Sequence, residues 1–113
     1  MEENADRLGS EDIDIKIERK GDTEVVLHVI GEINYQSHGE LVEAVNGLLN
    51  GQFKRVTLDL TQTQYIDSTG MGILVRIKHT LDSAGMELVL ANVPELIMDT
   101  FGVAKLTRVF QII

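Results

Sequence analysis

The strongest constraint on the fold is the regular alternation of two apolar patterns along the chain. In several segments between Ile13 and the last residue, apolar residues alternate with polar ones or run together over strand length. Between these segments lie stretches whose apolar residues repeat with helical spacing. Because consecutive parallel strands are joined by right-handed crossovers through helices, this order predicts a mainly parallel or mixed sheet with helices packed on it.

The predicted fold class is α/β, with about five strands and about three helices in an order close to ββαβαβαβ. Gly21-Asp22 predicts a hairpin turn between the first two strands, and Gly31 is expected to end the second one. The expected strands cover about 13–18, 25–30, 55–60 with an extension through Tyr65-Ile66, 87–91 and 109–113, and the expected helices about 37–49, 69–84 and 94–101.

Local signals place the ends of these helices. Ser37 is followed three residues later by Glu40, the spacing of a capping box, so the first helix is expected to start there. Asn50-Gly51 supplies the residues that usually end a helix, and Gly85 has the same role for the second helix. Pro94 fits the first turn of the third helix, where its missing N–H costs nothing.

Composition limits the function classes. A chain of 113 residues, 43% of them hydrophobic, can bury the core of one domain. The absence of Cys excludes disulfides, thiolate metal sites and Cys nucleophiles. No signal sequence or apolar run of membrane-spanning length is visible, so a cytoplasmic location is expected. The net charge of −8 argues against nucleic acid and against direct membrane binding.

Half of this charge is predicted to lie outside the folded domain. Residues 1–12 hold five acidic side chains against Arg7 and no aromatic residue. Such a composition is typical of a disordered, solvated tail. The folded domain is therefore expected to cover residues 13–113.

The most informative segment is the junction between the third predicted strand and the second predicted helix. Asp67 and Ser68 lie at this junction, and both residue types are favoured helix caps. Gly70 and Gly72 follow in the first turns, where each costs about 1 kcal/mol relative to Ala. They indicate a close approach of other atoms, either within the domain or from a partner or phosphate at the helix start. A serine hydroxyl there could also be phosphorylated reversibly.

This junction closely resembles the signature of the STAS domain of bacterial anti-sigma-factor antagonists, in which an apolar strand is followed by Asp-Ser-Ser/Thr-Gly, an apolar residue, Gly and a helix. The matching residues are Thr57-Leu58-Asp59-Leu60 and Tyr65-Ile66-Asp67-Ser68-Thr69-Gly70-Met71-Gly72-Ile73-Leu74. Gly31-Glu32-Ile33-Asn34 resembles the family's Gly-Glu-apolar-Asp corner, and Phe101-Gly102-Val103 with Leu106 resembles its closing segment. The resemblance covers about residues 13–113.

The resemblance implies a non-enzymatic anti-sigma-factor antagonist, without cofactor or metal, that regulates sigma-factor-dependent transcription. Ser68 would be the phosphoacceptor, with Thr69 as the alternative. The unphosphorylated form would bind an anti-sigma factor with serine kinase activity, phosphorylation would release that partner, and a PP2C-type phosphatase would reverse the modification. The implied partner-binding residues are Asp67, Ser68, Thr69, Gly70, Met71, Gly72, Glu32 and Asn34.

Two positions depart from the family pattern. Asn34 stands where the family usually has Asp, so a charged contact there would become neutral. The first helix lacks the Pro often found near its start, and Ser37-His38-Gly39 takes its place. Both departures leave the identity of the partner open.

Other functions remain open at this point. The chain could be a STAS module of another assembly, such as a ligand sensor, a stress-signalling scaffold or a lipid-transport accessory subunit. A histidine phosphocarrier acting through His38 is the enzyme-class rival, although His28, His38 and His79 share no metal-ligand spacing. Asp59 and Asp67 can be interpreted as paired carboxylates at the end of one strand, but no nucleophile and base accompany them.

Overall fold

The computed structural model describes residues 12–113, which form a six-stranded sheet with three helices. The acidic tail predicted for residues 1–12 lies, apart from Asp12, outside the described residues. The strands are β1 (Ile13–Lys20), β2 (Glu24–Ile33), β3 (Arg55–Asp59), β4 (Thr63–Ile66), β5 (Glu87–Ala91) and β6 (Gln111–Ile112), and the helices are α2 (His38–Asn46), α3 (Ser68–Ser83) and α4 (Glu95–Val103).

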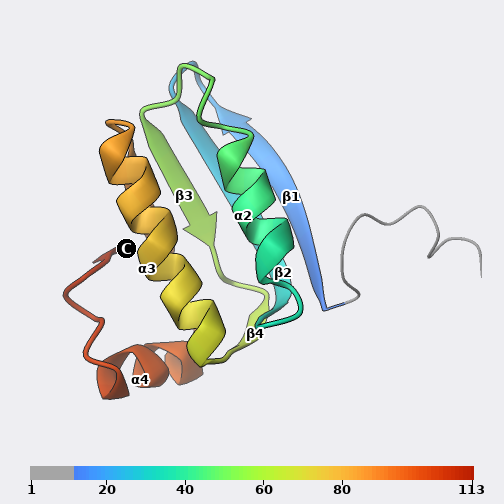
Figure 1. The fold of residues 1–113 in the computed structure, drawn as a ribbon, viewed down its shortest axis with the longest axis vertical. Helices are drawn as coiled ribbons and strands as arrows, with labels where there is room; N and C mark the ends of the chain where they lie inside the picture. Colours follow the sequence, from blue (N-terminus) through green and yellow to red (C-terminus); the bar gives the residue numbers. More distant parts are fainter. Residues whose placement is uncertain (1–11) are drawn as a thin grey trace, which may run out of the picture.

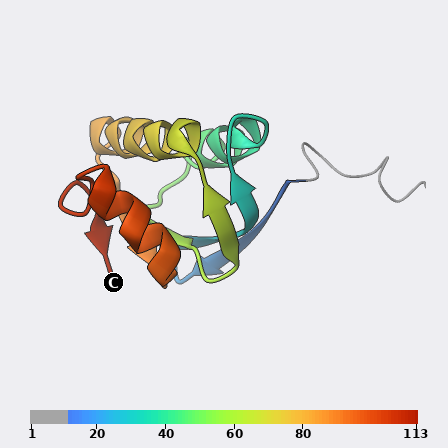
Figure 2. The same ribbon diagram turned by 90° about the horizontal axis from the view of Figure 1, so that it is seen from below.

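The sheet has the strand order β1-β2-β3-β5-β6, with β4 paired to β2 outside this path. The hairpin of β1 and β2 is antiparallel, and every other pairing is parallel. This topology confirms the predicted α/β class with a mixed, mainly parallel sheet. Figures 1 and 2 show α2 and α3 side by side on one face of the sheet, while α4 lies at the end of the domain where α3 begins.

The core lies between the sheet and the pair α2 and α3. Odd-numbered residues of β2 such as Leu27 point into it, and the rings of Phe101 and Phe110 meet there with centroids 5.6 Å apart. The largest fully buried side chains are Phe101, Leu27, Ile33, Leu41, Leu58, Leu60, Leu74, Leu81 and Leu90. No helix within residues 12–113 is long and apolar enough to cross a bilayer.

Strand β2 does not end at Gly31, as the sequence predicted, but continues to Ile33. Gly31 has φ +114°, and the pairing register shifts directly after it. A Cβ atom at this position would overlap the carbonyl oxygen of Asp12, so only glycine fits. The glycine therefore bends the strand rather than ending it, which is the usual role of a bulge.

The predicted extension of the third strand through Tyr65-Ile66 is also wrong, because these residues belong to a separate strand. Strand β3 pairs with the first half of β2, and β4 pairs with its last residues. The buried Thr63 hydroxyl fixes this second pairing by donating to the carbonyl oxygen of Val29 at 2.7 Å. The junction at Asp67 thus lies beside the end of β2, where Ile33 accepts its N–H.

Two predicted helix ends also differ from the structure. Helix α2 ends at Asn46 rather than near Asn50, and residues 47–50 form turns in which Leu48 is still buried. Pro94 precedes α4 instead of lying inside it, and its carbonyl accepts the N–H of Ile97 and Met98. Gly85, with φ +75°, follows the end of α3 as expected.

Candidate functional site

The candidate site is built around Asp67, the residue that caps α3. Its Oδ1 accepts the N–H of Gly70 at 2.7 Å, which satisfies one of the free donors of the first turn. Its Oδ2 accepts the N–H of Tyr35, at 3.3 Å, in the loop between β2 and α2. One carboxylate therefore joins the start of α3 to the loop before α2, and the predicted capping role of Asp67 is confirmed.

Ser68 is the first residue of α3 and is exposed. Its hydroxyl makes no hydrogen bond with any residue in the described range 12–113. Thr69, the alternative phosphoacceptor, is half-buried. A partner or a modifying enzyme can therefore reach the oxygen of Ser68 without first breaking a hydrogen bond within residues 12–113.

The two glycines of the junction have different environments. A Cβ atom on the buried Gly70 would overlap the carbonyl oxygen of Ile33, so this glycine allows α3 to pack on the end of β2. A Cβ atom on the exposed Gly72 would meet no atom within 4 Å. Packing inside the domain accounts for Gly70 and does not account for Gly72. Met71, between them, is half-buried against the core.

The loop between β2 and α2 is held together by its own side chains. Asn34 Oδ1 accepts the N–H groups of Gln36 and Ser37 at 2.9 and 3.0 Å. Asn34 Nδ2 donates to Glu32 Oε1 at 3.1 Å and to Asp12 Oδ2 at 3.5 Å. An aspartate could not make these two donations, so the departure from the family pattern at position 34 fits a position between two carboxylates.

The capping box predicted for Ser37 and Glu40 is absent. Ser37 precedes α2 but makes no side-chain cap bond to it. Its fully buried hydroxyl donates to the carbonyl oxygen of Glu32 at 2.6 Å and accepts the N–H of Asn34 at 3.0 Å. Ser37 therefore closes the loop onto β2, because the Glu32 carbonyl near the end of β2 accepts its hydroxyl.

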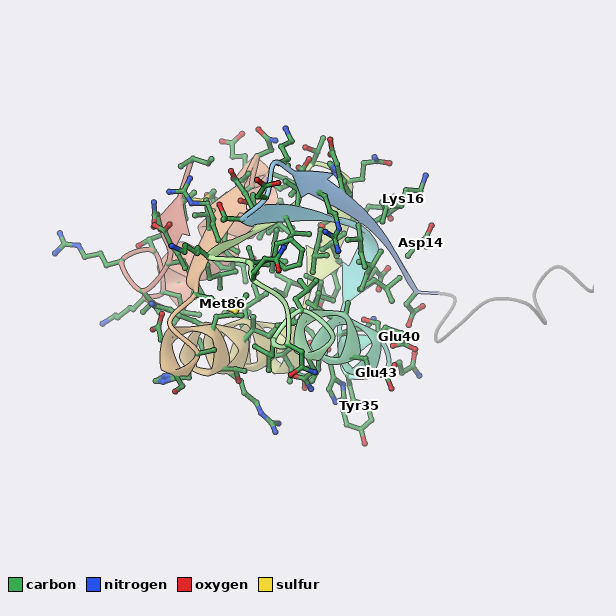
Figure 3. All side chains as sticks on the ribbon, turned by 90° about the horizontal axis from the view of Figure 1, so that it is seen from above. Asp14, Lys16, Tyr35, Glu40, Glu43 and Met86 are labelled. Carbon is green, nitrogen blue, oxygen red and sulfur yellow. The ribbon has the colours of Figure 1, made fainter. Side chains whose placement is uncertain are left out.

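Tyr35 is a candidate residue that the sequence analysis did not single out. Its side chain is 72% exposed, and Figure 3 shows the ring pointing away from the domain beside α2. The ring lies 5.8 Å from the ring of His38, and His38 Nδ1 lies 2.6 Å from the Tyr35 carbonyl oxygen. The only signal in the sequence is an aromatic residue in a polar turn that follows a strand.

The structure does not pair Asp59 with Asp67, because the two follow different strands. Asp59 lies on the face of the sheet opposite α2 and α3, where its Oδ2 is 3.0 Å from His28 Nδ1. The other nitrogen of His28 is 2.7 Å from Glu18 Oε1. This network joins three adjacent strands, and no group of acidic or histidine residues within 12–113 is arranged to hold a metal ion.

The ionisable groups of this network shift one another's pKa values. Hydrogen bonding to Glu18, followed by that to Asp59, raises the pKa of His28 against the opposing effect of burial. Hydrogen bonding to His28 lowers the pKa of Glu18. Partial burial raises the pKa of Asp59, but hydrogen bonds from Thr61, Asn92 and His28 outweigh it, so that this pKa is lowered.

The fold and the site together define a class: a small domain with a mixed sheet, two helices on one face, and an exposed serine at a capped helix start. The chain belongs to the STAS-domain family, whose sequence model matches residues 14–113.

Individual relatives agree with this assignment. The chain is 27% identical over 100 residues to an anti-sigma-B factor antagonist of Listeria monocytogenes, a match that covers 88% of each chain. Among solved structures it resembles an anti-sigma factor antagonist from Mycobacterium paratuberculosis, with a TM-score of 0.74, 20% identity and coverage of 93% and 89% of the two chains. It also resembles the phosphorylated form of the Bacillus cell fate determinant SpoIIAA, with a TM-score of 0.68, 15% identity and coverage of 88% and 91%.

Proposed function

We propose that this protein is an anti-sigma-factor antagonist whose binding surface is centred on Ser68 and is controlled by phosphorylation of that residue. The observation that carries the proposal is the exposed Ser68 hydroxyl, which makes no hydrogen bond within residues 12–113, on a helix start fixed by Asp67. The curated relative with 27% identity, named an anti-sigma-B factor antagonist, supports the same class.

The position of Ser68 explains how a phosphate could switch binding without unfolding the domain. A phosphoserine adds a charge of about −1.5 to −2 at neutral pH. At the first residue of a helix this charge meets the positive end of the helix dipole, so it is tolerated by the fold. Its effect would then fall on the partner, which meets a dianion where it had met a small neutral hydroxyl.

The proposed binding surface includes the exposed residues around this helix start. Gly72 leaves bare backbone one turn from Ser68, and Tyr35 adds an exposed aromatic ring from the loop that Asp67 holds. Glu32 and Asn34 support this loop through their mutual hydrogen bond. Thr69 is the weaker candidate for modification because it is half-buried.

The proposed partners supply all the chemistry. An anti-sigma factor with serine kinase activity would bind the unphosphorylated form and transfer phosphate to Ser68, and a PP2C-type phosphatase would remove it. This chain would act as a non-catalytic regulatory protein, which matches the class named for its relatives.

Affinity capture from an extract of the native cells tests the proposal. The baits are the wild type, Ser68→Ala, Ser68→Asp and, as a matched control, Thr69→Val. We expect the wild type, Ser68→Ala and Thr69→Val to capture an ATP-binding serine kinase, and Ser68→Asp to lose it. Equal capture by all four baits would contradict the switch.

Mass spectrometry of the protein isolated from cells tests the site itself. Acid-stable phosphate on Ser68 is the expected result. Phosphate found only on Thr69 would move the site by one residue, and acid-labile phosphate on His38 would favour a phosphocarrier. Stable co-purification with transporter subunits would instead indicate a STAS module of another assembly.

A further inference from the structure

The free edge of the sheet at β1 is the strongest unassigned feature of the molecule. In Figure 1 no described element lies beyond β1 on its outer side. The strand is eight residues long, and the sheet order places it at the end. Such an edge presents a row of unpaired N–H and C=O groups that can pair with another strand.

The register with β2 shows which backbone groups face outward. Asp12 and Glu32 form a hydrogen-bonded pair, since the N–H of Glu32 donates to the Asp12 carbonyl at 2.8 Å. Hydrogen-bonded pairs alternate in an antiparallel ladder, so the even-numbered residues of β1 bond to β2. The odd-numbered residues Ile15, Ile17 and Arg19 therefore direct their N–H and C=O groups to the open edge.

When two copies of β1 lie antiparallel to each other, the charges of one strand are complementary to those of the other. Four exposed residues on the face opposite the helices alternate in sign, namely Asp14, Lys16, Glu18 and Lys20. In an antiparallel pair of two β1 strands centred on Ile17, each acid lies opposite a lysine of the other copy. Shifting the centre by one residue to position 16 or 18 places like charges opposite each other. Shifting it by two residues, to Ile15 or Arg19, keeps within β1 only the pair of Asp14 with Lys16 or of Glu18 with Lys20. The charge pattern therefore favours the register centred on Ile17, which pairs all four charges.

The same register explains an exposed apolar residue. Ile17 is on the helix side of the sheet, opposite Leu27, yet its side chain is 58% exposed. At the centre of the pair it would meet the Ile17 of the second copy. The central Ile17 pair would be flanked on each side by a pair of Ile15 with Arg19. Together these three pairs would supply about six backbone hydrogen bonds.

We propose that β1 pairs antiparallel with β1 of a second copy of this chain on a two-fold axis through Ile17, which joins the two sheets into one. A guard against edge pairing would be best served by charges of one sign, whereas alternating signs make self-pairing attractive. Ile17 pairs with Leu27, and Leu27 precedes Ile33, the residue beside the Asp67 junction, by six positions. The two-fold axis therefore lies about 20 Å along β2 from the Ser68 region. Dimer formation is therefore independent of the proposed switch.

Sedimentation-velocity centrifugation of the full chain over a range of concentrations measures the association. We expect a reversible monomer–dimer equilibrium in the wild type. Asp14→Lys and Lys20→Asp each replace two attractive cross-strand pairs by two repulsive ones, and each should raise the dissociation constant about tenfold. Arg108→Asp is the control, since this exposed residue precedes β6, at the opposite end of the sheet order from β1; its dissociation constant should be unchanged.

Recombining the charges tests the register. The double variant Asp14→Lys/Lys20→Asp should regain the wild-type dissociation constant, and an equimolar mixture of the two single variants should form heterodimers. Ile17→Pro removes only an outward N–H and should give a folded monomer, with circular dichroism as the check. A wild type that stays monomeric up to about 1 mM, or a dimer indifferent to the charge at position 14, would overturn the proposal.

Discussion

The backbone of Tyr35 is hydrogen-bonded to the side chain of Asp67, although 32 positions separate them in the sequence. The same carboxylate caps α3 through Gly70. The exposed aromatic ring and the exposed serine at the helix start are therefore held in one arrangement by one acidic residue. Three predictions test this arrangement and the contacts that surround it, and a fourth tests the His28 network on the opposite face of the sheet.

Replacing Asp67 should affect both stability and loop order. Asp67→Ala removes a helix cap and should lower the free energy of unfolding by about 1 kcal/mol. Asp67→Asn keeps an acceptor oxygen and should lose less. Urea denaturation measures both, with Asp99→Ala on the exposed side of α4 as the control. A loss no greater than that of the control would show that the cap does not stabilise α3.

The glycine pair offers a matched comparison within one helix. Gly70→Ala should destabilise the domain by about 3 kcal/mol, because the added Cβ overlaps the carbonyl oxygen of Ile33. Gly72→Ala should be neutral or should stabilise it by up to about 1 kcal/mol, since its Cβ meets open space. If Gly72→Ala keeps this stability and loses the captured kinase, Gly72 contacts the partner. Equal destabilisation by both would contradict the structure.

Stability should depend on pH through the His28 network. The raised pKa of His28 means that its contribution is complete below the ordinary pKa of 6.5 and is lost as the pH rises through the folded value. The lowered pKa values of Glu18 and Asp59 mean that their contributions are present above ordinary values of 4.5 and 3.8 and are lost in acid. The difference in unfolding free energy between wild type and His28→Gln should therefore be largest near pH 5 to 6.

Denaturation of both proteins between pH 4 and pH 9 measures this difference. His79→Gln is the control, because this exposed histidine of α3 has no such partners among residues 12–113. A difference that grows toward alkaline pH would mean that neutral His28, rather than the imidazolium, is the form the network stabilises.

Asn34→Asp restores the family's usual acid and should destabilise this protein by about 1 to 3 kcal/mol. The change removes the amide that donates to Glu32 and Asp12 and places a third carboxylate beside them. The loss should shrink in acid, where carboxylates become neutral, and denaturation at pH 7 and pH 4 measures this change. Asn34→Asp with unchanged stability at pH 7 would show that the amide donations contribute little.

Features encoded by neighbouring residues were predictable from the sequence. Asp67 as a cap, Ser68 at the start of a helix and Gly85 after its end depend on short-range chemistry, and the structure confirms these placements. Helical spacing in 69–84 likewise predicted α3 to within one residue at each end.

Features that depend on distant segments were not predictable. Ser37 has the spacing of a capping box, but the Glu32 carbonyl competes for its hydroxyl once β2 is in place. The division of residues 55–66 into β3 and β4 depends on which half of β2 each one pairs with. The contact of His28 with Asp59 likewise requires the parallel register of β2 and β3.

The central position of β2 also governs the order of events during synthesis. The ribosome releases the β1–β2 hairpin first, and an isolated two-stranded hairpin is only marginally stable in water. Both parallel partners of β2 lie within residues 55–66, so the hairpin must wait for this later segment before the open edge of β2 is paired. Until then β2 itself is an exposed apolar edge. A nascent chain stalled before residue 55 should therefore bind a chaperone, whereas one stalled after α3 should not.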